Sequence, residues 1–106
     1  MKITQKIIPG FPSYGSGISS LKPKYIVIHD TAGQSSASAE AIRVQKPSAY
    51  NNGVAHYYID DKECYQVIKD NVKAWHCGDG YKGKGNGESI GIEVCKSLPG
   101  GNFKNN

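Results

Sequence analysis

The sequence predicts an α/β fold built on a mixed β-sheet. The segment KYIVIHD at residues 24–30 is a short, mostly β-branched apolar run, which is typical of a buried strand. The segment ESIGIEVCKS at residues 88–97 alternates apolar and small or polar residues, which also indicates a strand. Between them lies ASAEAIRVQK at residues 37–46, the best helix candidate. Strands interleaved with a helix favour a mixed sheet.

The size and composition indicate one globular domain. The chain has 106 residues, 38% of them hydrophobic and 21% charged, which fits a folded rather than a disordered chain. Thirteen glycines predict many turns, and seven tyrosines indicate amphipathic aromatic surfaces such as a sugar or peptide groove.

The first half of the chain is expected to run from a loose segment through a strand to a helix. Residues 1–23 are rich in Pro, Gly and Ser and should lie over the core. The strand 24–30 is followed by a loop, TAGQSS, in which Ser36 or Ser38 caps the helix 37–46. Ala39, Ile42 and Val44 lie near one face of that helix, and Pro47 ends it. A turn follows at residues 49–53.

The second half is expected to contain a strand pair, a loop and a last strand. Residues 53–61 and 63–70 form the pair around an Asp-Asp-Lys turn. Residues 72–78 are extended, and residues 78–87, with five glycines, form an irregular loop. The strand 88–97 completes the sheet.

The charge pattern favours anionic partners. The net charge is +4, which favours nucleic acid, anionic lipid or an anionic cell-wall polymer. The scattered lysines and single arginine form no basic cluster with interleaved aromatic residues, which argues against nucleic acid. No apolar run is long enough to insert in a membrane, and residues 1–10 contain no signal-peptide core. Three cysteines without a CxxC pair argue against a disulfide framework and for a reducing compartment, with each thiol buried or idle.

The last strand carries a candidate catalytic carboxylate. Ile90, Ile92 and Val94 share one face, which should pack on the core. The other face carries small residues and Glu93, and so leaves room above the sheet for a ligand. Glu93 is either a general acid or base, or a partly exposed carboxylate on a wet sheet face.

The histidines and cysteines admit several interpretations. His29, at the end of a buried strand, needs a partner that is a protein group, water, a metal or a substrate. His56 is expected to be packed and hydrogen-bonded, and its spacing from Cys64 to be a coincidence. His76 and Cys77 are adjacent, so in an extended segment they should point to opposite sides and not share a metal.

The glycine-rich loop contains a misleading motif. GDGYKG matches the GxGxxG pattern, but a strand follows it rather than the helix that a dinucleotide site requires. The loop is either a flexible connection or the wall of a substrate groove in which Tyr81, Lys82 and Lys84 make exposed contacts.

Four stretches together are specific. YIVIHDTAG, GVAHYYIDD, AWHCGDG and NGESIGIEVC occur in this order, and over about residues 20–101 the chain resembles the zinc-dependent N-acetylmuramoyl-L-alanine amidases of phage endolysins, relatives of the peptidoglycan recognition proteins. The resemblance implies a mixed β-sheet flanked by helices, with Zn²⁺ over the sheet. It also implies hydrolysis of the amide between the lactyl group of N-acetylmuramic acid and L-alanine.

The resemblance assigns roles to particular residues. His29 matches the first zinc ligand, and Glu93 matches the carboxylate that moves a proton from water to the leaving amine. Ala55 stands where another branch has a tyrosine, so Glu93 carries that role here. We expect the groove for the peptidoglycan stem peptide and glycan to be lined by His76, Asp30 and Tyr81.

The resemblance also carries an expectation about completeness. In this family the other two zinc ligands follow a helix beyond the last strand, so residues 1–106 are expected to be a single, incomplete catalytic domain that lacks this helix and ligand segment. Apolar sheet surface would then be exposed, and we expect a homo-oligomer or binding of a complementing C-terminal segment. The alternative to an enzyme is a non-catalytic peptidoglycan-binding module or a self-associating fragment. A phage or prophage protein of this kind is made in the host cytoplasm and acts on the bacterial cell wall.

Overall fold

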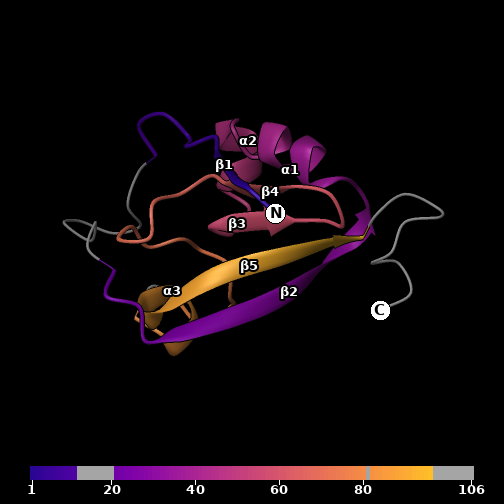
Figure 1. Ribbon diagram of the computed structural model, residues 1–106. Coiled ribbons are helices and arrows are strands. Elements are labelled where there is room, and N and C mark those ends of the chain that lie inside the picture. The colour runs from indigo at the N-terminus through magenta and orange to yellow at the C-terminus, as the bar shows by residue number, and fades with distance from the viewer. Residues whose placement is uncertain (12–20, 81, 97–106) are drawn as a thin grey trace.

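The computed structural model describes residues 1–11, 21–80 and 82–96, and it shows the mixed sheet that the sequence predicts (Figure 1). Five strands are arranged in the order β1-β4-β3-β5-β2. The β3/β4 pair is antiparallel, and the β1/β4, β3/β5 and β2/β5 pairs are parallel. The strands are β1 (Ile3–Gln5), β2 (Tyr25–Gln34), β3 (Tyr57–Ile59), β4 (Cys64–Gln66) and β5 (Ser89–Lys96).

The two long parallel strands are the predicted ones, and β2 is longer than expected. The prediction that β2 is buried is wrong, because it is an edge strand of the described sheet and Tyr25, Ile26 and Ile28 are exposed. The loop predicted after residue 30 is wrong for residues 31–34, because β2 continues to Gln34, with a register irregularity between Asp30 and Gln34. The short strand β1 was not predicted: it pairs with β4, and the chain then brings Ile8 into the core. The rest of the leading segment, residues 12–20, lies outside the described residues.

Helix α1 (Ala37–Arg43) covers one face of the sheet. Its N-cap is Ser36, whose side chain accepts a hydrogen bond from the Ala39 amide, so Ser36 rather than Ser38 caps the helix. Of the three residues predicted to share one face, Val44 is buried, whereas Ala39 and Ile42 are exposed, so the predicted face is wrong. The buried positions Ala37, Ala41 and Val44 follow helical spacing and let the helix approach the sheet closely.

The prediction that Pro47 ends the first helix is wrong. Helix α1 already ends at Arg43, and Pro47 opens the short helix α2 (Pro47–Tyr50), where a missing N–H costs nothing. The predicted hairpin of β3 and β4 is confirmed, although both strands are shorter than expected. Its turn is closed by Asp60, whose carboxylate accepts from the amides of Lys62, Glu63 and Ala37.

The loop 78–87 is more regular than predicted, because its end forms the helix α3 (Lys84–Glu88) beside the start of β5 (Figure 1). Lys84 lies over the ring of Tyr25 at 6.0 Å, so it contacts β2 rather than a groove. No helix in the described part of the chain has the length and apolarity needed to cross a bilayer.

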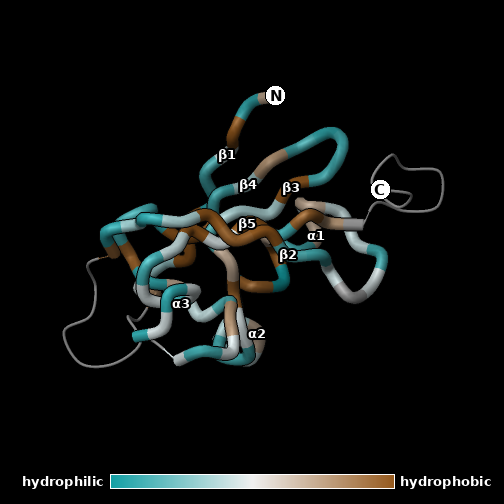
Figure 2. The backbone as a smooth tube through the Cα atoms, turned by 90° about the horizontal axis from the view of Figure 1, so that it is seen from below, coloured by the Kyte–Doolittle hydropathy of each residue, from teal (hydrophilic) through white to brown (hydrophobic). Residues whose placement is uncertain are grey.

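The face of β5 that packs on the core is not the predicted one. Ser89 and Cys95, which share the face of Glu93, are 1% and 0% exposed. On the other face Ile26 and Ile28 are 66% and 59% exposed, and they pair in register with Ile90 and Ile92. The physical reason is close approach: α1 and the segment 72–78 pack where the side chains of β5 are small. Hydrophobic stretches of β2 and β5 are therefore visible from below (Figure 2).

Candidate metal centre and active-site cleft

Three polar side chains lie in one row across the sheet. His29 of β2 is opposite Glu93 of β5, and Glu93 is opposite Tyr58 of β3. Residues in register on neighbouring strands point to the same face and are about 5 Å apart. The row therefore places an imidazole, a carboxylate and a phenol side by side on the face that α1 partly covers.

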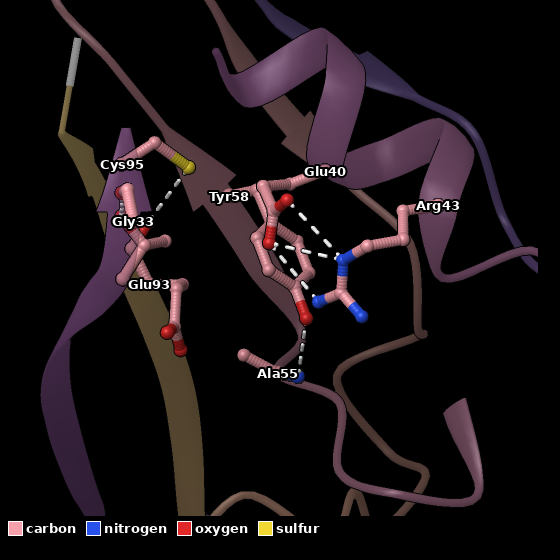
Figure 3. A network of polar contacts seen from close by, with 8 residues as sticks. Gly33, Glu40, Arg43, Ala55, Tyr58, Glu93 and Cys95 are labelled. Atoms are coloured by element: carbon pink, nitrogen blue, oxygen red, sulfur yellow. Dashed lines mark hydrogen bonds and ion pairs between the residues drawn. The ribbon is translucent and has the colours of Figure 1, made fainter. Parts of the chain in front are cut away.

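A cleft of about 440 Å³ opens over this row. Figure 3 shows the Glu93 carboxylate on the same side of the sheet as the Tyr58 hydroxyl and the Arg43 guanidinium. The Tyr58 hydroxyl accepts a hydrogen bond of 3.1 Å from the Ala55 amide, and Arg43 is paired with Glu40 at 3.0 Å. The cleft lining combines these side chains with His29, Asp30, Asn52, Gly53, Val54, Trp75, His76, Cys77 and Gly78.

Three potential metal ligands meet at one edge of the cleft. His29 Nε2 lies 3.0 Å from His76 Nδ1, and Cys77 Sγ lies 3.3 Å from His76 Nδ1 and 4.0 Å from His29 Nε2. The prediction that His76 and Cys77 point to opposite sides is wrong. The chain bends at Cys77 instead of continuing as a strand, so side-chain alternation does not apply there.

A buried amide holds this bend in place. Asn86 is 1% exposed, and its Oδ1 accepts hydrogen bonds of 2.7 Å from the backbone amides of both His76 and Cys77. Its Nδ2 donates to the Cys77 carbonyl, also at 2.7 Å. The carboxylate of Asp79 in turn accepts from the amides of Gly85 and Asn86 and so fixes the start of α3. Sequence analysis missed Asn86, because an asparagine between glycines reads as part of a turn.

Two glycines make the close approach possible. A Cβ atom at Gly91 would lie 2.6 Å from Cγ of His76, and a Cβ atom at Gly85 would overlap the side chain of Cys77. The space predicted above the small face of β5 is thus occupied in part by the ring of His76. The ligand space lies beside that ring, over Glu93.

His56 is the packed, hydrogen-bonded histidine that the sequence predicts. It is 0% exposed, its Nδ1 accepts from the Gly91 amide, and its Nε2 donates to the Val72 carbonyl. Both ring nitrogens are therefore used by the backbone, and the spacing to Cys64 is a coincidence, as expected. Burial lowers the pKa of His56, which keeps the ring neutral.

We expect this histidine to make the protein less stable in mild acid. Because its pKa is lowered in the folded state, the unfolded chain binds the proton more readily as the pH falls below about 6.5. The free energy of unfolding should fall there by up to about 1.4 kcal/mol per pH unit. Urea unfolding at pH 7.5 and 5.5 measures this, and His56→Gln should show a smaller difference between the two pH values. Equal pH dependence in both proteins would contradict the assignment.

Two titratable groups of the cleft, Glu93 and His76, have pKa values that are shifted in opposite directions. Burial raises the pKa of Glu93, and Glu40 raises it further while Arg43 opposes this. Burial lowers the pKa of His76 to about 4, and His56 and His29 add to the effect. A carboxylate with a raised pKa is suited to taking and returning a proton, and a neutral imidazole is the form that binds a metal.

The remaining residues that the sequence singled out lie in different places relative to the cleft. Asp30 is exposed and contributes to the cleft edge, but its register opposite Val94 turns its side chain to the other face. Tyr81 lies outside the described residues. Cys64 and Cys95 are buried as expected, whereas Cys77 is neither buried nor idle. Sequence analysis missed Tyr58 and Arg43, which reach the cleft only through the strand register and the path of α1.

Comparison with known proteins gives a consistent result. Residues 19–105 match the family model described as N-acetylmuramoyl-L-alanine amidase. The chain is 43% identical over 81 residues to the N-acetylmuramoyl-L-alanine amidase CwlA of Bacillus subtilis (strain 168), covering 76% of this chain and 29% of CwlA. It is 36% identical over 101 residues to the endolysin LysK of Staphylococcus phage K, covering 92% of this chain and 20% of LysK.

Solved structures agree with this match. The catalytic domain of XlyA superposes with a TM-score of 0.84 at 34% identity, covering 98% of this chain and 67% of that one. A mutant endolysin from Bacillus subtilis superposes with a TM-score of 0.82 at 39% identity, covering 97% of this chain and 66% of that one. The chain therefore spans about two thirds of these solved chains and less than a third of CwlA and LysK.

Proposed function

Because the chain belongs to the N-acetylmuramoyl-L-alanine amidase family, we propose that its cleft hydrolyses the amide between N-acetylmuramic acid and the L-alanine of the peptidoglycan stem peptide. One observation carries the proposal: His29 and Glu93 stand in register on one sheet face, beneath an open cleft. A ligand for a metal and a proton-transfer group side by side are what metal-assisted amide hydrolysis requires.

The donor set supports zinc as the cofactor. His29 would hold the ion. A nitrogen of His76 and the sulfur of Cys77 lie within 4.8 Å of the ring nitrogen that His29 offers. Nitrogen and sulfur ligands in such proportions are typical of zinc sites. Bound zinc supplies a Lewis acid that polarises the scissile carbonyl and activates water.

Glu93 is proposed to move the proton. Its carboxylate takes a proton from the attacking water as the water oxygen bonds to the carbonyl carbon. It then gives that proton to the amide nitrogen as the carbon–nitrogen bond breaks, which releases a carboxylic acid and the free amine of L-alanine. The half-buried position and raised pKa of Glu93 make the second transfer easier than it would be for an exposed carboxylate.

The test is release of free amino groups from purified bacterial cell walls in the presence of zinc. We expect release that depends on Glu93 and on zinc. Binding to the walls without release would instead favour the second candidate, a non-catalytic peptidoglycan-binding module. For either function, the basic net charge is proposed to draw the protein, once made in the host cytoplasm, to the anionic cell wall.

We also propose that a second copy of the chain covers the exposed face of β2 and β5. Ile26 and Ile28 stand next to Ile90 and Ile92 there, so the face is apolar over two neighbouring strands, and β2 is an edge strand of the described sheet. A patch of this kind in one copy is complementary to the same patch in another.

This predicts a dimer in sedimentation analysis at high protein concentration. Ile26→Asp should shift the mass towards the monomer, because it places a charge in the apolar contact. Ile42→Asp is the matched control: Ile42 is comparably exposed, at 59%, but lies on α1. A monomeric wild-type protein would contradict the proposal, and a dimer abolished equally by both variants would place the contact elsewhere. Occupation of the face by a complementing segment of another polypeptide would leave the isolated chain monomeric.

A further inference from the structure

We propose that the guanidinium of Arg43 binds a carboxylate of the substrate's peptide, on the residue that follows L-alanine. The inference rests on the function proposed above and deepens it, because it makes Arg43 a specificity-determining residue. It also gives the substrate a direction in the cleft, with the peptide running from Glu93 towards α1.

Arg43 supplies the fixed positive charge of the cleft. The cleft lining within the described part of the chain contains this arginine and no lysine. The carboxylates of Asp30 and Glu93, which also line the cleft, have the opposite sign. An anionic group of a substrate is therefore repelled by these two carboxylates and attracted by Arg43.

One edge of the guanidinium is used by the protein, and the other is left for a ligand. Nε of Arg43 donates to the two carboxylate oxygens of Glu40 at 3.2 and 3.3 Å, and Nη2 donates to the same carboxylate at 3.0 Å. The guanidinium makes no other hydrogen bond to the described part of the chain, so Nη1 and the outer N–H of Nη2 lack protein partners. Two parallel N–H donors of this kind match the two oxygens of a carboxylate.

The guanidinium is held in place before a ligand arrives. The side chain of Glu40 is only 12% exposed, whereas that of Arg43 is 51% exposed. Both residues lie on α1, which the buried Ala37 and Ala41 anchor against the sheet. A partly buried partner thus orients the guanidinium while its outer edge stays accessible. Such preorganisation lowers the entropy cost of binding a ligand.

Arg43 also lies at a suitable distance from the proposed proton carrier. Tyr58 stands in register beside Glu93, about 5 Å away on the next strand, and Figure 3 shows Tyr58 between Glu93 and Arg43. An extended residue spans about 3.3–3.6 Å, so a carboxylate one residue beyond the scissile amide lies roughly 5–8 Å from it. With the amide over Glu93, that carboxylate reaches the neighbourhood of Arg43.

The chemistry of the substrate assigns this carboxylate to the peptide. The carboxyl group of N-acetylmuramic acid is consumed in the scissile amide, so the sugar offers no free carboxylate beside the cleaved bond. The residue after L-alanine offers one as its α-carboxylate or, if it is acidic, as its side chain.

The experiment measures the binding of synthetic probes to the full chain. In the diacid probe, glutamate with both carboxylates free follows N-acetylmuramoyl-L-alanine, and in the diamide probe both are amides. Isothermal titration calorimetry is carried out in the Glu93→Gln background, so that the probes are not hydrolysed. We expect the diacid to bind about 10–100-fold more tightly than the diamide, the usual effect of charge-assisted hydrogen bonds. The two monoamides then identify the bound carboxylate, because only the one that retains it keeps the tight binding.

Three variants in the same background make the result specific. Arg43→Gln should bind the diacid and the diamide equally. Because it leaves the partly buried Glu40 without its partner, the doubly neutral variant Glu40→Gln/Arg43→Gln is measured as well and should behave in the same way. Lys46→Gln is the matched control: Lys46 is an exposed cation three residues further along and is not part of the cleft lining, so the preference for the diacid should persist.

Three results would overturn the inference: equal binding of diacid and diamide with Arg43 in place, no binding of either probe, or a preference for the diacid that survives in both Arg43 variants. If the wild type releases amino groups from cell walls but the two probes bind equally, the amidase function stands and the role of Arg43 fails. If the diacid is preferred through Arg43 but no amino groups are released, the carboxylate site stands and the amidase function fails.

Discussion

Glu93→Gln is expected to reduce amide hydrolysis by about 10²–10⁴-fold, the usual contribution of a positioned general acid–base group. Glutamine has nearly the same shape as glutamate but cannot take a proton from water. In the described sheet, Glu93 is the carboxylate in register with His29, the proposed metal ligand. The measurement is the rate of amino-group release from cell walls.

The same substitution should leave the protein slightly more stable at neutral pH. Burial raises the pKa of Glu93, so its ionised form opposes folding at every pH above the ordinary carboxyl pKa of about 4.5. A neutral amide removes that penalty. Lost activity with equal or higher stability is a combination that a merely structural glutamate would not produce.

The control is Glu88→Gln. Glu88 lies at the end of α3 and is paired with the exposed Lys24 at 3.2 Å, a contact of small energetic value. We expect this variant to keep its activity. Zinc content is measured for both variants, so that a loss of metal is not mistaken for a loss of proton transfer. A Glu93→Gln variant with full zinc and near wild-type rates would remove Glu93 from the mechanism.

Gly91→Ala is expected to destabilise the fold by about 1–3 kcal/mol, the usual cost of overpacking, and to disrupt the metal cluster. The added Cβ would lie 2.6–2.8 Å from Cγ, Cδ2 and Nδ1 of the His76 ring. The backbone of Gly91 cannot easily retreat, because its amide donates to His56 Nδ1 and its carbonyl accepts from the His56 amide. The ring of His76 must therefore move from its present position beside His29.

Urea unfolding gives the change in stability, and zinc analysis gives the loss of metal. Gly33→Ala is the matched control: Gly33 also lies in a strand, β2, but nothing stands within 4 Å of its added Cβ, so stability should change by no more than about 0.5 kcal/mol. If Gly91→Ala unfolds at the same urea concentration as the wild type and keeps its zinc, the ring of His76 is not held as the structure shows.

The alternation in ESIGIEVC determined which residues share a face but not which face is buried. The prediction that the face of Ile90, Ile92 and Val94 packs on the core is wrong, because the small residues of the other face permit closer packing. The packing of α1 and the segment 72–78 against the small face decided it, and left Ile26 and Ile28 exposed. The hairpin at Asp60 depends on local interactions, so its sequence signal was sufficient. The sequence left Ser36 and Ser38 as alternative helix caps, and the structure selects Ser36.

The sequence by itself determined the mixed sheet and the presence of His29 and Glu93 on its two long strands, but it placed His29 at a strand end, whereas β2 continues to Gln34 and His29 lies near its middle. The sheet and its two long strands follow from local periodicity and from four motifs in a characteristic order. Only the tertiary structure decided that His76 and Cys77 turn towards His29, 47 and 48 residues away. The reason is that a bend held by Asn86, and not a strand, carries these two residues. Side-chain direction in such a bend depends on distant hydrogen bonds and on the space above Gly91 and Gly85, which no local pattern records.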